Sequence, residues 1–96
     1  MFTKTLDDYA VESIKDLLTS SDYKSIVRYM TICLSKHHEY FKQVMENPRN
    51  IDANFEMDCY YQRIGIIYDH VFKNMPEMYD DFTFWSGTFT ESLEKF

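Results

Sequence analysis

The stretch from Asp22 to Glu46, DYKSIVRYMTICLSKHHEYFKQVME, decides the fold. Its apolar residues recur every three or four positions, which is the spacing of one face of an α-helix. Asp22 is a suitable N-cap, and Pro48 disfavours a helical residue before it. We therefore predict a helix over residues 22–46. Its apolar arc is wide enough to contact more than one neighbouring helix.

Helical spacing also runs through the segment before this stretch. Thr5 is a suitable N-cap, and Asp7 and Asp8 follow it in the first turn, where the helix dipole favours negative charge. The apolar residues after them share one face. We predict a shorter helix over residues 5–19, which ends at a polar break.

The segment after Pro48 predicts a third helix, over residues 51–74. It has a main apolar face and a second, smaller apolar set on the other side, made of Phe55, Cys59 and Ile66. A helix that is apolar on two sides is either central in a bundle or lies at a subunit interface. Gly65, in the middle of this helix, is expected to permit a close helix crossing or a slight bend.

The C-terminal segment allows two interpretations. Pro76 can begin a short helix. Beyond it, residues 82–85 alternate as a strand does, and the Ser-Gly pair at 86–87 can close a small hairpin. In the alternative, a loop leads to a terminal helix from Thr88, whose spacing to Glu91 fits a capping box. We favour the helix, because an isolated two-stranded hairpin is only marginally stable.

Together these segments predict an all-α protein. We expect one helical domain over residues 1–96, a compact bundle of three main helices (about 5–19, 22–46 and 51–74) with one or two short C-terminal helices. No apolar run approaches the roughly 20 residues that span a membrane, and the N-terminus has no apolar signal core. Only two cysteines are present, too few for a typical disulfide scaffold. A cytoplasmic protein is the expectation.

Charge is distributed unevenly along the chain. The net charge of −6 lies entirely in residues 50–96, which hold nine acids and three bases, whereas residues 1–49 are balanced. Such a protein is repelled by nucleic acid and attracted to a basic protein surface; alternatively, the charge serves only solubility. Alanine, glycine, proline and arginine are scarce, which is the bias of an AT-rich coding sequence. This bias is frequent in phages and other mobile elements and also in many bacterial genomes.

Motifs for catalysis are missing from the sequence. Two glycines cannot build a phosphate loop, and no nucleophile elbow, Cys-x-x-Cys or His-Glu-x-x-His pattern occurs. Cys33 and His37, one helical turn apart, can in principle hold a metal ion or act as a nucleophile and its base. Their apolar neighbours favour a buried thiol and a core histidine instead. We therefore predict no catalytic residue, no metal and no cofactor.

These observations favour a binding protein over an enzyme. We hypothesise a small acidic antagonist, encoded by a phage or mobile element, that blocks a host defence protein or nucleic-acid-handling protein, or neutralises a toxin, by occupying its surface. In the most specific version of this hypothesis, the protein imitates the charge of DNA. Acids and aromatic residues, the types that such a surface needs, give the candidate partner-binding residues: Tyr79, Asp80, Asp81, Phe82, Phe84 and Trp85, with Asp58 and Asp69.

Two alternatives remain open at this level. The aromatic residues of the C-terminal segment can instead cover the open end of the bundle. The protein can also be a self-assembling structural or scaffolding subunit, in which Phe55, Cys59 and Ile66 meet their symmetry mates.

Overall fold

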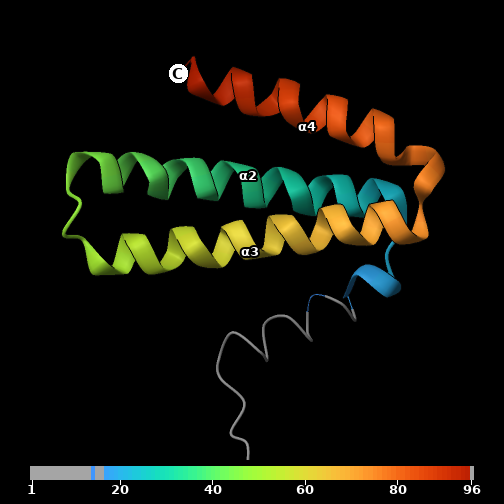
Figure 1. Ribbon diagram of the computed structural model, residues 1–96, viewed down its shortest axis with the longest axis horizontal. Helices are drawn as coiled ribbons and strands as arrows, with labels where there is room; N and C mark the ends of the chain where they lie inside the picture. The colour runs from blue at the N-terminus through green and yellow to red at the C-terminus, as the bar shows by residue number, and fades with distance from the viewer. Residues whose placement is uncertain (1–13, 15–16, 96) are drawn as a thin grey trace, which may run out of the picture.

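The computed structural model describes residue 14 and residues 17–95 of the chain. It contains α2 (Tyr23–Glu46), α3 (Ile51–Asn74), the 3-10 turn η1 (Pro76–Met78) and α4 (Tyr79–Glu94), as Figure 1 shows. Ile14 and residues 17–19 are also helical; the remainder of the helix predicted over 5–19 lies outside the described residues. The described part of the chain contains no strand, and the all-α prediction is confirmed.

Helices α2 and α3 form an antiparallel hairpin whose ends agree with the sequence prediction. The Asp22 side chain accepts a hydrogen bond from the Ser25 backbone N–H at 2.8 Å, and the Asn50 side chain accepts one from Ala53 at 3.1 Å. Both are side-chain N-caps, which satisfy backbone donors that the first helical turn leaves unpaired. Pro48 lies in the short turn between the two helices.

The C-terminal segment is helical, as the favoured interpretation predicts, and Pro76 begins a short helical turn. After η1 it continues as one helix from Tyr79 to Glu94, so the hairpin and the loop before Thr88 are both wrong. Helix α4 tolerates its serines and threonines because their hydroxyls donate to carbonyls of the same helix. Thr88 donates to the Phe84 carbonyl oxygen at 3.0 Å instead of capping a helix start.

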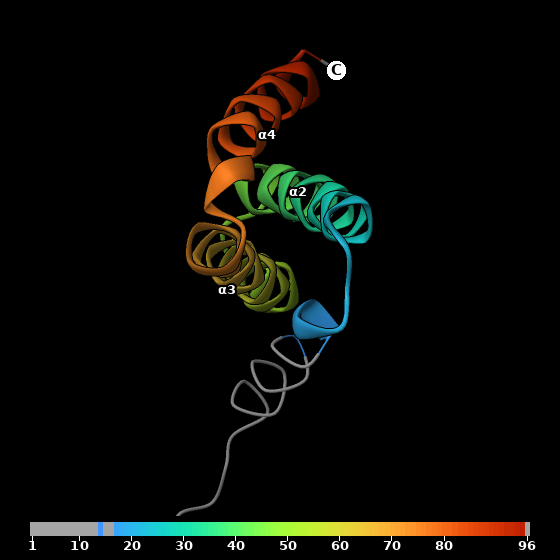
Figure 2. The same cartoon turned by 90° about the vertical axis from the view of Figure 1, so that its right-hand side faces the viewer.

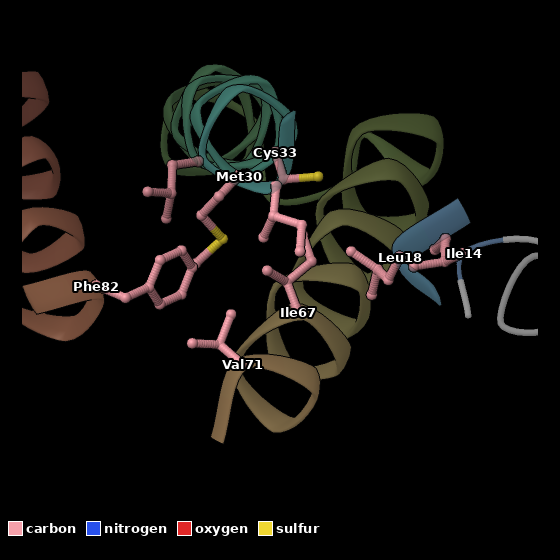
Figure 3. Packing of buried hydrophobic residues seen from close by; sticks show 9 residues of the cluster. Ile14, Leu18, Met30, Cys33, Ile67, Val71 and Phe82 are labelled. Carbon is pink, nitrogen blue, oxygen red and sulfur yellow. The ribbon is translucent and has the colours of Figure 1, made fainter. Parts of the chain in front are cut away.

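The core lies between α2 and α3 and is closed from two sides. In Figures 2 and 3, α4 and the short helical segment around Leu18 lie on opposite sides of the α2–α3 pair. Phe82 of α4 is fully buried and enters the core from one side, while Leu18 enters it from the other. The buried cluster consists of Ile14, Leu18, Ile26, Met30, Cys33, Leu34, Ile67, Val71 and Phe82.

Gly65 does not permit a close helix crossing, which is one of the two roles expected for it. Gly65 is exposed, and no described neighbouring atom lies within 4 Å of the position that a Cβ would occupy. A glycine that permits a close helix crossing would have such a neighbour. The described part of the structure therefore gives no packing reason for a glycine at position 65.

A helix needs about 20 predominantly apolar residues to span a bilayer. Of the helices in the described ranges, none is both long enough and apolar enough to cross a bilayer.

Candidate protein-binding site

Helix α4 divides the predicted partner-binding segment into two sides. Tyr79, Phe82 and Trp85 pack on the core side, whereas Asp80, Asp81 and Phe84 are exposed. Phe82 and Phe84 show the division most clearly, because the exposed fraction of Phe82 is 0% and that of Phe84 is 78%. Two positions along an α-helix correspond to a rotation of about 200°, so the two rings point to opposite sides.

We call the exposed residues Asp80, Asp81, Phe84 and Glu91 the outer face of α4. Asp80 and Asp81 lie one turn before Phe84, and Glu91 lies about two turns after it. None of the three acids forms an ion pair with a described residue. An aromatic side chain thus stands in solvent among unpaired carboxylates.

The acidity of the sequence is concentrated on this part of the fold. Residues 76–95 hold five acids and one base: Glu77, Asp80, Asp81, Glu91 and Glu94 against Lys95. The charge contributed is −4, compared with −6 for the whole chain. The first-turn acids also stabilise α4 itself, because the N-terminal end of a helix dipole favours negative charge.

The other two acidic candidates lie on a different helix. Asp58 and Asp69 are exposed on α3. Asp69 is paired with Lys73, whose Nζ is 3.1 Å from the carboxylate. This pair offsets the charge of Asp69. Because Phe82 is buried and Tyr79 and Trp85 pack on the core, the structure does not bring all eight candidates together on one surface.

The three candidates for self-association do not form a continuous exposed stripe. Phe55 is 52% exposed, but Cys59 and Ile66 are only partly exposed. Ile66 packs against the buried cluster and lines a cavity beside Leu18. Of the three, Phe55 alone offers a large apolar surface to a second copy.

A groove between α2 and α4 was not predicted from the sequence. Figure 1 shows that α4 starts near the C-terminal end of α3 and runs back on the α2 side of the hairpin. The groove has a volume of about 190 Å³ and is lined by Leu34, His37, His38, Phe41, Thr90, Leu93 and Glu94. Its apolar residues belong to the helical stripes that periodicity identified, but their meeting depends on where α4 lies.

Two histidines enter this groove from α2. Burial, together with the neighbouring His38, lowers the pKa of His37 below its usual value, so this ring is neutral at pH 7. The His37 ring is tilted against Tyr61 with 6.0 Å between ring centroids. The Nε2 atom of His38 is buried and has no hydrogen-bond partner in the part of the chain that the structure describes.

The cysteine that suggested metal or nucleophile chemistry is buried. Cys33 has an exposed fraction of 0%, and burial raises the pKa of its thiol to about 11. A neutral thiol is neither a good nucleophile nor a good metal ligand. Among the residues that the structure describes, no group of three or more histidine, cysteine or acidic side chains is placed to hold a metal ion.

Comparison with known proteins gives one result. No family model, curated protein or solved structure matches this chain. What the surface can bind is therefore inferred from its own chemistry, which is that of an acidic helix face with an aromatic residue at its centre.

Proposed function

We propose that this protein is a non-enzymatic antagonist that inhibits a basic protein by binding it through the outer face of α4. The observation that carries the proposal is Phe84, 78% exposed and flanked by Asp80 and Asp81. Buried aromatic anchors supply much of the affinity of protein interfaces, and complementary charges set the rate and the choice of partner. The outer face supplies both, and the fold itself does not use the Phe84 ring in its core.

The chemistry of the outer face defines the partner. It is a protein with lysines or arginines around an apolar pocket that accepts one aromatic ring. Nucleic acid does not fit, since unpaired carboxylates repel phosphates. The proposed targets are host defence proteins, proteins that handle nucleic acids, and toxins. Proteins that bind nucleic acid present basic surfaces to the phosphates, and the coding bias is one that phages and mobile elements share with many bacterial genomes.

The first test is capture of the partner from nuclease-treated lysate of the native host at low and high salt, followed by an affinity measurement with the purified partner. Two variants address the outer face: Asp80→Lys with Asp81→Lys, and Phe84→Ala. We expect each to weaken binding at least tenfold, as hot-spot changes do. The double charge reversal should also abolish the salt dependence.

A matched control reverses two exposed acids of α2, Glu39→Lys with Glu46→Lys, and so changes the net charge equally. This control should bind within twofold of the wild type. Equal binding by the wild type and both outer-face variants would remove α4 from the interface. A partner recovered only when nuclease is omitted would contradict direct protein binding.

A second candidate function is a self-assembling structural or scaffolding subunit. Ile51 and Phe55, one turn apart at the start of α3, are 80% and 52% exposed, an apolar surface that a second copy can cover. If so, analytical ultracentrifugation should show an oligomer that Phe55→Glu dissociates. A wild-type protein that remains monomeric at the highest soluble concentration would exclude this function.

A further inference from the structure

The groove between α2 and α4 has the shape and chemistry of a receptor for one side chain. Its volume of about 190 Å³ is too small for a helix but suits a single large apolar side chain. Leu34, Phe41 and Leu93 supply apolar walls. Phe41 is still 45% exposed, so the folded chain leaves part of this apolar surface uncovered.

The groove lining contains one acid, Glu94, and no lysine or arginine. Glu94 lines the groove and forms no ion pair with any described residue. His37 is neutral at pH 7 because burial lowers its pKa, so it does not oppose a cation beside Glu94. An apolar side chain with a neighbouring lysine or arginine therefore matches both the walls and the carboxylate.

One further observation points to a ligand. The Nε2 atom of His38 is buried without a hydrogen-bond partner among the described residues, and a buried polar atom without a partner is costly unless something pairs with it. Glu94 also lies three residues after Glu91, which makes the two carboxylates neighbours on the helix surface. The groove is therefore continuous with the outer face of α4.

We propose that the α2–α4 groove binds a segment of the partner protein in which a large apolar side chain stands next to a lysine or arginine. The apolar side chain enters between Leu34, Phe41 and Leu93, and the cation pairs with Glu94. A backbone or side-chain group of the segment pairs with His38. That the segment belongs to the partner protein rests on the proposed function. The residue types of the segment are inferred from the groove alone.

The test uses a probe of defined structure and does not need the partner. A blocked dipeptide amide, acetyl-Phe-Lys-amide, is titrated into the full-length ¹⁵N-labelled protein at pH 7 and followed by NMR. We expect a dissociation constant of about 1 mM, with the largest amide shifts at His37, Phe41 and Leu93. Acetyl-Ala-Lys-amide should bind at least tenfold more weakly, because it lacks the apolar group.

Two exposed acids, one in the groove and one outside both the groove and the outer face, provide a matched pair of variants. Glu94→Lys should weaken binding of acetyl-Phe-Lys-amide about fivefold, whereas Glu77→Lys, in η1, should change it less than twofold. Equal effects of the two variants would overturn the proposal. So would a lack of shifts in the groove at about 10 mM probe, or shifts there on simple dilution, which would mean that a second copy occupies the groove.

The outcomes separate this inference from the proposed function. If the dipeptide does not bind but the Asp80 and Asp81 reversal still abolishes partner capture, the groove proposal fails alone. If the dipeptide binds as described and no partner depends on the outer face, the proposed function fails and the groove remains a binding site.

Discussion

Replacing Phe82 by alanine should lower the free energy of unfolding by about 3–5 kcal/mol, the usual cost of removing a buried phenylalanine. The ring has an exposed fraction of 0%. It packs edge-on against Tyr68 at 5.3 Å and against Tyr23 at 6.3 Å between ring centroids. These contacts join α4 to both α2 and α3. The variant should therefore loosen α4 from the hairpin as well as leave a cavity.

Two readouts separate a loosened α4 from general unfolding. Trp85 is the only tryptophan, and its ring centroid lies 5.9 Å from that of Phe82, so its fluorescence should move to longer wavelength in the variant. Chemical denaturation followed by circular dichroism should give the loss of stability. Far-UV helicity should fall only modestly at low denaturant, because the α2–α3 hairpin retains its own packing.

Phe84→Ala is the matched control, since it removes the same side chain two positions away in the same helix. Phe84 is 78% exposed, so its removal should change the stability by no more than about 0.5 kcal/mol. If the Phe82 variant were as stable as the wild type, Phe82 would not be the residue that anchors α4. If both variants lost the same large free energy of unfolding, both rings would belong to the core.

The α2–α3 hairpin could be predicted from sequence because local and global signals agree there. Asp22 and Asn50 are capping residues, Pro48 separates the helices, and the long apolar stripes have one period throughout. Each signal depends on neighbouring residues only. The predicted ranges 22–46 and 51–74 therefore match α2 and α3.

Helix α4 could not be predicted in the same way, because its local signals conflict. Phe82 and Phe84 lie on the same side of a strand but on opposite sides of a helix. Ser86 and Gly87 are poor helix formers and are typical of turns. Tertiary contacts favour the helix. Phe82 fills the core, and the buried Ser86 hydroxyl is hydrogen-bonded to the Tyr68 hydroxyl. Neither contact can be inferred from neighbouring residues.

The sequence therefore predicted which residue types form the candidate site, but not how these residues are arranged in space. The acidity of the segment was evident, yet only the helix shows that Asp80, Asp81 and Phe84 share the exposed side while Tyr79 and Trp85 do not. The groove was not predicted, because it forms only where α4 lies against α2, and the position of α4 could not be inferred from the sequence.

Replacing both glycines by alanine should stabilise the protein by about 1–2 kcal/mol, with a rise in Tm of roughly 5–15 °C. Gly65 lies in α3 and Gly87 in α4, and both have ordinary negative φ values. An added Cβ would have no described neighbour within 4 Å at either position. The gain comes from the unfolded chain, in which alanine has fewer conformations to lose than glycine.

The single variants make this prediction informative about assembly as well as stability. Each should contribute about 0.5–1 kcal/mol, and the effects should add because the two glycines lie on different helices. Differential scanning calorimetry over a range of protein concentrations measures both quantities. If α3 packs against a second copy at Gly65, then Gly65→Ala should weaken the oligomer and lower its Tm, while Gly87→Ala still raises it. An increase from both variants, independent of concentration, would instead mean that this face of α3 is exposed to solvent in the functional protein.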